Sequence, residues 1–310
     1  MANIRGRGLT ALLEAALADH RACTEGAPAD YIPALAKVDP DLFALAVCTP
    51  DGAVTATGDI DCLFSIQSIS KVSTLALVLE QSGAELVIDK IGVNPTGRRF
   101  NSMEAVEENR GRDLNPLVNA GAIATVGLVR GDASEVWSSI AAINAGFMGR
   151  SLAVDAEILA SEMGSNDRNR AVAHLMRSYG AFARDAEEAV ELYTRQCAQM
   201  VTVRDLALMA GTLAMRGRNP QTGQQVLAPS HVTGVLAVMV SAGLYEDSGE
   251  WLFRMGLPAK SGVGGGIIAV VPGRIGMAAF SPRLDEAGAS VRGMRALTDI
   301  AQALGANLFL

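Results

Sequence analysis

Two strand–turn–strand patterns lie near opposite ends of this 310-residue chain, and they limit its fold more than any other feature. Residues 42–49 and 53–57 flank a Pro-Asp-Gly turn, and residues 266–271 and 275–280 flank a Pro-Gly-Arg turn. Each pattern is typical of a β-hairpin. The segment between them, from 68 to about 250, is mostly helical in pattern. We therefore predict an α+β fold, an α/β sandwich in which one central antiparallel sheet is built from both ends of the chain, with flanking helices and an inserted helical lobe.

The predicted helices occupy most of the remaining chain. We treat 1–310 as a single domain, with a sheet lobe formed by 1–67 plus 250–310 and a mainly helical lobe formed by 68–249. Apolar periodicity predicts the following helices: 8–23, 68–82, 119–129, 134–145, 170–184, 187–199, 203–215, 230–241 and 286–304.

Composition excludes several classes of function. Hydrophobic residues make up 49% of the chain and charged residues 19%, so a large core can form. No run of about 18 uncharged apolar residues is present, which argues against a membrane span. A net charge of −7 without a basic cluster argues against a nucleic-acid partner. The start of the chain lacks a secretory apolar segment, and the four cysteines show neither C-x-x-C nor zinc spacing. We expect a cytoplasmic protein with reduced thiols and no metal or organic cofactor.

A Ser-x-x-Lys motif, Ser68-Ile69-Ser70-Lys71, opens the predicted helix 68–82. Residues three apart share one helix face, which places the Ser68 hydroxyl within reach of the Lys71 amine. Apolar neighbours on both sides of Lys71 indicate burial, which lowers the pKa of a lysine, and a neutral amine can accept the proton of a serine. A single match of this kind is weak evidence, since the motif is short.

A second lysine motif, Lys260-Ser261-Gly262, precedes the C-terminal hairpin. The chain has only four lysines, and two of them stand in an S-x-x-K motif and a later K-[ST]-G motif. That pair, in that order, is the signature of serine β-lactamases and penicillin-binding proteins. In their arrangement the strand after K-[ST]-G lines the site, and its backbone N–H helps to form an oxyanion hole. The alternative interpretation of Lys260 is a surface lysine before a glycine turn.

The chain also resembles a narrower family, the serine-dependent glutaminases, which have a β-lactamase-like fold and convert L-glutamine to L-glutamate and ammonia. The resemblance covers about 31 to 295, and a departure at 162–166 leaves the spacing between Glu162 and Asn169 intact. Five segments carry it: Tyr31-Ile32-Pro33, Phe64-Ser65-Ile66-Gln67-Ser68-Ile69-Ser70-Lys71, Asn115-Pro116-Leu117-Val118-Asn119-Ala120-Gly121-Ala122-Ile123, Asp167-Arg168-Asn169 and Gly256-Leu257-Pro258-Ala259-Lys260-Ser261-Gly262-Val263.

The resemblance implies a catalytic set. Ser68 is the expected nucleophile, forming a γ-glutamyl ester, and Lys71 is the expected general base. Tyr245 is expected to contact Ser68 and relay a proton. The backbone N–H groups of Ser68 and Val263 are expected to stabilise the tetrahedral oxyanion.

The resemblance also implies a substrate-binding set. Glu162 suits the α-ammonium of the substrate, and Asn119 and Asn169 suit its α-carboxylate. Tyr31 and Tyr193, with Tyr245, align with substrate-site tyrosines of the family. The alternative interpretations are a solvated helix glutamate, capping or turn asparagines, and half-buried aromatic residues.

Two other functions remain open at this point. A β-lactamase or penicillin-binding-type acyl-transferase would share Ser68, Lys71 and Lys260. It should carry a signal peptide, because its substrates lie outside the cytoplasm, and it would not need Glu162 to bind a free α-amine. A non-catalytic binding module on the same fold would tolerate loss of the nucleophile or the base, and both are present. Among glutaminases, homodimers and homotetramers are common, so we expect one of these assemblies.

Overall fold

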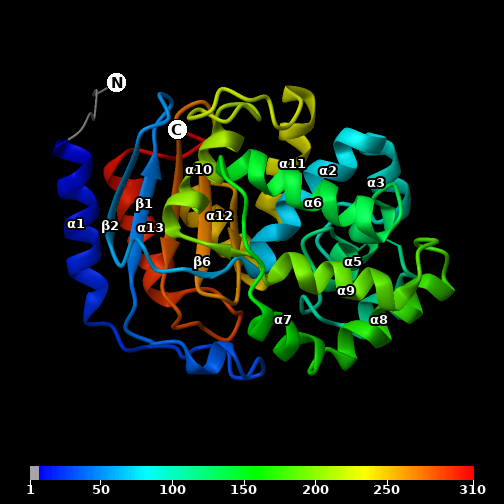
Figure 1. Ribbon diagram of the computed structural model, residues 1–310. Coiled ribbons are helices and arrows are strands. Elements are labelled where there is room, and N and C mark those ends of the chain that lie inside the picture. Colours follow the sequence, from blue (N-terminus) through cyan, green and yellow to red (C-terminus); the bar gives the residue numbers. More distant parts are fainter. Residues whose placement is uncertain (1–6, 113) are drawn as a thin grey trace.

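A five-stranded antiparallel sheet is the centre of the computed structural model, which describes residues 7–112 and 114–310 (Figure 1). Its strand order is β2-β1-β7-β6-β5, and a separate two-stranded ladder joins β3 and β4. The strand bounds are β1 (Ala44–Cys48), β2 (Val54–Gly58), β3 (Phe64–Ser65), β4 (Met200–Val201), β5 (Ala259–Ser261), β6 (Gly266–Val271) and β7 (Ile275–Phe280).

The two predicted hairpins form and then join edge to edge. β1 pairs with β2, β6 pairs with β7, and β1 and β7 pair in the register Ala44↔Phe280 through Cys48↔Gly276. This contact closes one continuous sheet from segments about 230 residues apart. The prediction of an antiparallel sheet assembled from both ends of the chain is confirmed.

Helices cover both faces of the sheet and form a lobe beside it. Figure 1 shows α1 and α13 against one face and a group of helices on the other side. None of the helices in the described part of the chain combines the length and apolar character needed to cross a bilayer. The helical bounds are α1 (Arg7–Arg21), η1 (Leu35–Lys37), η2 (Gln67–Ile69), α2 (Ser70–Ser82), α3 (Ala84–Lys90), α4 (Met103–Glu108), α5 (Asn119–Leu128), α6 (Ala133–Met148), α7 (Ala156–Met163), α8 (Asp167–Ser178), α9 (Ala186–Cys197), α10 (Val203–Ala214), α11 (Pro229–Ala242), η3 (Tyr245–Asp247), α12 (Ser248–Met255) and α13 (Val291–Ala303).

Both faces of the sheet are apolar because both are covered. In β1, Leu45 and Val47 join the core shared with α1 and α13, whereas Ala44, Ala46 and Cys48 join the core shared with α10 and the helical lobe. The strand side chains alternate between faces, so an almost continuous apolar run supplies both cores.

Helix α10 lies unusually close to the sheet because glycines face each other at the contact. A Cβ atom on Gly276 of β7 would lie 2.0 Å from the backbone nitrogen of Gly211 in α10. A Cβ atom on Gly211 would lie 2.7 Å from the sulfur of Cys48. α10 lies within the inserted helical segment in sequence but packs on β1, β6 and β7, and so connects that segment to the sheet.

Several predicted boundaries shift for identifiable reasons. The predicted helix 68–82 begins with the 3₁₀ turn η2 before α2 continues it. The predicted helix 170–184 is α8, which begins at Asp167 and ends at Ser178, before Gly180 adopts a φ of +75°. The predicted helix 286–304 begins only at Val291, because Ser290 caps it through its side chain. The short elements α3, α4, α7, α12, β3, β4 and β5 were absent from the sequence prediction.

The contact between Gly211 and Gly276 makes a stability prediction. Gly276→Ala should lower the free energy of unfolding by about 1–3 kcal/mol, since the added methyl group meets backbone atoms of α10 that cannot rotate away. Equilibrium denaturation in urea measures this loss.

Gly234→Ala in α11 is the matched control, because a Cβ atom there has nothing within 4 Å. A methyl group at a free helical position should stabilise the protein by about 0.5–1 kcal/mol. Equal effects of the two substitutions would mean that α10 and β7 can separate without cost.

Candidate active site

Ser68 lies in a strained turn where the small ladder meets the helical lobe. The preceding residue, Gln67, has a φ of +50°, a conformation that side chains rarely adopt. The turn is held in place by its neighbours: the Ile66 N–H donates to the carbonyl of Gln199, and the Ser70 hydroxyl donates to the carbonyl of Gln67. Strain that the surrounding structure maintains is common at functional sites.

Glycines bring the K-S-G segment directly against this turn. A Cβ atom on Gly262 would lie 2.9 Å from the Ile66 carbonyl oxygen and 3.4 Å from the Ser68 nitrogen. A Cβ atom on Gly264 would lie 2.3 Å from the Ser65 carbonyl oxygen. The S-x-x-K and K-S-G motifs, nearly 200 residues apart, are therefore neighbours. Lys260 and Ser261 lie within the edge strand β5 rather than ahead of the sheet strands, so the alternative of a surface lysine is wrong.

The Lys71 amine is buried and has a defined set of partners. Its side chain is 1% exposed, and its Nζ lies 2.7 Å from Asn119 Oδ1, 3.4 Å from the Leu117 carbonyl oxygen and 3.3 Å from Tyr245 Oη. Burial lowers the Lys71 pKa to about 7, and the negative charge of Glu162 limits that shift. A substantial fraction of Lys71 is therefore neutral near pH 7.

Tyr245 links Lys71 to the serine. Its hydroxyl forms a side-chain hydrogen bond with Ser68 and lies against Lys71 Nζ. Tyr245 is buried, and its φ of +55° is again a rare backbone conformation. The ring of Phe100 stacks on it with a centroid separation of 4.5 Å. Tyr245 thus contacts both Ser68 and Lys71.

Three predicted substrate-binding side chains form a connected polar group. The Asn119 side chain donates to Asn169 Oδ1 at 3.2 Å, and the Tyr193 hydroxyl donates to Asn119 Oδ1 at 3.3 Å. They come from the starts of α5 and α8 and from the buried face of α9. Asn119 also contacts Lys71, so this polar group borders the amine.

Glu162 approaches from the end of α7 and is held by Gln67. The Gln67 amide donates to Glu162 Oε2 at 3.2 Å and to the Ser65 hydroxyl at 3.2 Å. Burial raises the Glu162 pKa to about 7, while the Gln67 hydrogen bond and the charge of Lys71 oppose that rise. A carboxylate in this position favours a cationic group beside it, because the cation offsets the cost of burying the charge.

Tyr31 and Val263 line the entrance to the site. Together with Phe100 they form part of the wall of a surface cavity of about 500 Å³. Tyr31 is 57% exposed, whereas Val263 is buried. Burial raises the pKa of the Tyr31 hydroxyl, and the negative charge of Glu162 raises it further. Tyr31 and Val263 therefore border the same cavity as Phe100, whose ring stacks on Tyr245.

Two residues of the site, Gln67 and Phe100, were not predicted from the sequence. The sequence singles out Gln67 only as part of a motif. Its side chain bonds to Glu162 from a backbone with a positive φ, which no sequence pattern predicts. Phe100 lies in the polar segment 94–102, where no periodicity singles out an aromatic residue. A lone aromatic residue in such a segment was the only available signal.

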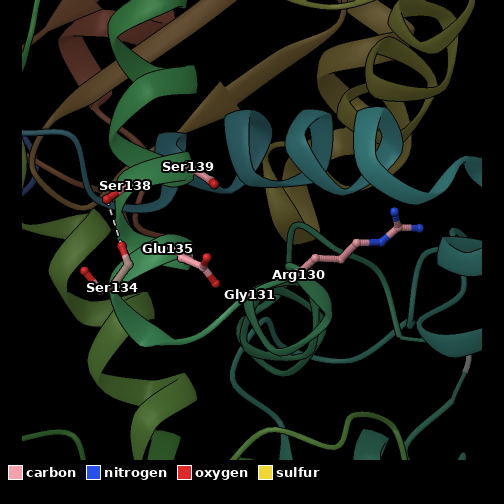
Figure 2. Close-up of a pocket in the computed structure, with 6 residues that line it drawn as sticks. All are labelled: Arg130, Gly131, Ser134, Glu135, Ser138 and Ser139. Carbon is pink, nitrogen blue, oxygen red and sulfur yellow. Dashed lines mark hydrogen bonds between the residues drawn. The ribbon is translucent and has the colours of Figure 1, made fainter.

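A second hollow, of about 520 Å³, lies at the start of α6 (Figure 2). Its lining contains none of the predicted site residues, and the Glu135 side chain within it caps α6 by accepting from the Asp132 N–H. The six lining residues are Arg130, Gly131, Ser134, Glu135, Ser138 and Ser139. Among the described residues, no cluster of three or more metal-ligating side chains is present, here or around Ser68.

Comparison with known proteins decides the family. The glutaminase family model matches residues 26–309. The chain belongs to the glutaminase family. A glutaminase of Colwellia psychrerythraea is 53% identical over 287 residues, which cover 92% of each chain. A solved probable glutaminase superposes with a TM-score of 0.95 at 47% identity, over 97% of this chain and 98% of the other.

This glutaminase also has a more distant solved relative. The structure of a probable glutaminase from Bacillus subtilis, complexed with 6-diazo-5-oxo-L-norleucine, is 30% identical with a TM-score of 0.89, over 100% of this chain and 99% of the other. The β-lactamase-like fold and the hydrolysis of glutamine expected from the resemblance are thus confirmed, and the β-lactamase and binding-module alternatives are set aside.

The two shifted pKa values predict the pH dependence of this enzyme. Lys71 must lose its proton to act as a base, and Glu162 must lose its proton to hold an ammonium, each near pH 7. Both active forms increase as the pH rises, so log kcat/KM for glutamine should climb with a slope above one below pH 7 and level off above it. A steady-state pH profile measures this slope. An activity that is independent of pH between 5 and 8 would contradict both roles.

Proposed function

We propose that this glutaminase hydrolyses L-glutamine through a γ-glutamyl ester on Ser68. The Ser68 oxygen attacks the side-chain amide carbon and forms a tetrahedral intermediate. The C–N bond then breaks, and the nitrogen leaves as ammonia after it gains a proton. Water attacks the ester, releasing glutamate and restoring the Ser68 hydroxyl. The observation that supports this sequence best is the hydrogen-bonded series Ser68, Tyr245 and Lys71.

The partners of Lys71 favour a proton path through Tyr245. A neutral amine has two N–H groups and one lone pair. The Leu117 carbonyl and Asn119 Oδ1 can only accept, so they take the two N–H groups. The lone pair is left for the Tyr245 hydroxyl, which then donates to Lys71 and accepts from Ser68. The Ser68 proton therefore passes to the Tyr245 oxygen while the Tyr245 proton passes to Lys71. Lys71 later returns a proton, again through Tyr245, to the leaving nitrogen.

The oxyanion is stabilised by backbone amides. Ser68 lies in the first turn of η2, where N–H groups have no acceptor within the helix. Val263 follows Gly262, whose backbone lies against Ser68. The N–H groups of Ser68 and Val263 therefore suit an oxygen that gains negative charge during attack, and such donors contribute strongly in a buried site.

Substrate recognition uses charge at one end of the site and amides at the other. Glu162 pairs with the α-ammonium, and the amide groups of Asn119 and Asn169 bind the α-carboxylate. Tyr31, Tyr193 and Tyr245 enclose the aliphatic part.

We also infer that the enzyme works in the cytoplasm as a homodimer or homotetramer. The four cysteines are free thiols, consistent with a reducing compartment. The large exposed side chain of Phe253 on α12, together with Leu308, Phe309 and Leu310, provides apolar surface. Light scattering on the purified protein tests the assembly, and a monomer at all micromolar concentrations would contradict it.

Ser68→Ala should abolish ammonia release while leaving the fold unchanged. The alanine removes the covalent nucleophile, so the rate should fall by at least about 10⁴-fold, the scale typical of lost nucleophiles. A coupled ammonia assay measures the loss, and calorimetry with L-glutamate shows that the site still binds. Retention of more than about one per cent of the activity would exclude the ester mechanism.

Glu162→Gln should separate recognition of the ammonium from catalysis. The substitution keeps the shape and removes the charge, so kcat/KM for L-glutamine should fall by about 10- to 1000-fold. A glutamine analogue without the α-amine should be a poor substrate of the wild type and should lose little more in the variant. Equal losses for both amides would show that Glu162 is structural and that the ammonium binds elsewhere.

A further inference from the structure

The site contains a second buried lysine that the proposed mechanism does not use. Lys260 on β5 is 0% exposed. Its Nζ donates to the Gly243 carbonyl at 2.9 Å and to the Ser261 carbonyl at 2.7 Å, and it lies 4.0 Å from the centroid of the Tyr245 ring. Two carbonyl oxygens and the electron-rich face of a ring all favour a cation, and none of them supplies a proton.

Lys71 has a different set of partners. Two of its hydrogen-bond partners are pure acceptors, and the third is the Tyr245 hydroxyl, which can donate. The rings of Tyr193 and Tyr245 lie farther from its Nζ than the ring beside Lys260, at 5.8 and 5.4 Å. The partners of Lys260 suit an ammonium with three N–H groups. Those of Lys71 suit a neutral amine with two N–H groups and a lone pair.

The two amines are close enough for positive charges on both to repel each other. Lys71 Nζ lies 5.4 Å and Lys260 Nζ lies 4.0 Å from the centroid of the same ring, so they are less than about 10 Å apart. Burial lowers the pKa of both amines, and a positive charge on either one disfavours a positive charge on the other. The other titratable groups that face the pair are Glu162 from α7, Tyr193 and Cys197 from α9, and Tyr245 from η3. We therefore expect the two amines to carry one positive charge between them. Their hydrogen-bond partners indicate which lysine carries it.

We propose that Lys260 holds that proton and acts as a positioning residue, keeping Lys71 in its neutral form and holding Tyr245 in place. The proposal rests on the proposed function, in which Lys71 is the base. A positive charge on Lys260 disfavours a second one on Lys71 nearby. It also lies beneath the ring whose hydroxyl passes the proton, where it stabilises negative charge that develops on the oxygen.

Lys260 also fixes the backbone that carries Tyr245. It binds the carbonyl of Gly243, two residues before Tyr245, and Gly243 itself lies close enough to β5 that a Cβ atom would meet the Ala259 oxygen at 1.8 Å. The rare φ of Tyr245 is maintained by this attachment of η3 to the edge strand.

Lysine NMR tests the assignment in the wild type. Because the chain has only four lysines, a protein labelled at lysine Cε gives four signals, and substitution of Lys37 or Lys90 by Arg identifies the two surface residues. Lys71→Met identifies Lys71 and leaves Lys260 by elimination. At pH 8 we expect the Lys260 signal at the position of a charged amine and the Lys71 signal at that of a neutral amine.

The outcomes separate the inference from the proposed function. A neutral Lys260 beside a neutral Lys71 overturns the inference alone. A charged Lys71 at pH 8 overturns Lys71 as the base, and with it the proposed mechanism.

The Lys260→Met variant provides the kinetic test. Without the neighbouring charge, the acid limb of the kcat/KM profile should move to higher pH by about one unit, so activity at pH 7 should fall about fivefold more than activity at pH 9. Lys90→Met, at the surface beside Asp89, is the matched control and should leave the profile in place. A uniform loss at every pH would show a purely structural role for Lys260 and would overturn the proposal. If the Lys260→Met protein does not fold, the NMR of the wild type decides alone.

Discussion

The burial of the Lys71 amine is the constraint on which the rest of the site depends. An ammonium taken out of water must be paired or must lose its proton, and Lys71 is surrounded by a carbonyl, an amide oxygen and a hydroxyl rather than by an adjacent carboxylate. The nearest carboxylate influence, Glu162, only limits the fall in its pKa. A partly neutral amine near pH 7 therefore follows from the burial of Lys71 among Leu117, Asn119 and Tyr245.

The fold reaches that arrangement through close backbone contacts made by small residues. Gly211 and Gly276 bring α10 onto the sheet, Gly243 brings η3 onto β5, and Gly262 brings β5 onto the Ser68 turn. Each contact places backbone atoms where a side chain would otherwise stand. The sheet, joined from both ends of the chain, thus packs against the segment that carries Ser68 and Lys71.

Much of this architecture was predictable because it depends on local patterns. The two hairpins have turn residues flanked by apolar runs, and the motifs around Ser68 and Lys260 are short and follow a characteristic order along the chain. The roles of Tyr31, Asn119 and Tyr193 came only from resemblance, since nothing local distinguishes them from ordinary polar residues. Gln67, Phe100 and the edge strand β5 could not be found, because a rotated backbone, a ring stacked across the site and a three-residue strand arise only from tertiary packing. The division into a sheet lobe and a helical lobe stays a prediction, and α10 connects the two.

The central claim is that the Ser68 proton leaves through Tyr245 to a neutral Lys71. Tyr245→Phe tests it most directly, because phenylalanine keeps the ring between Phe100 and Lys260 and removes only the hydroxyl. The decisive measurement is a single turnover of L-glutamine with enzyme in excess, in which ammonia release reports the first chemical step. We expect a loss of about 10²- to 10⁴-fold in that step, with binding of L-glutamate little changed. A variant that releases ammonia at the wild-type rate would show that Ser68 gives its proton to another group.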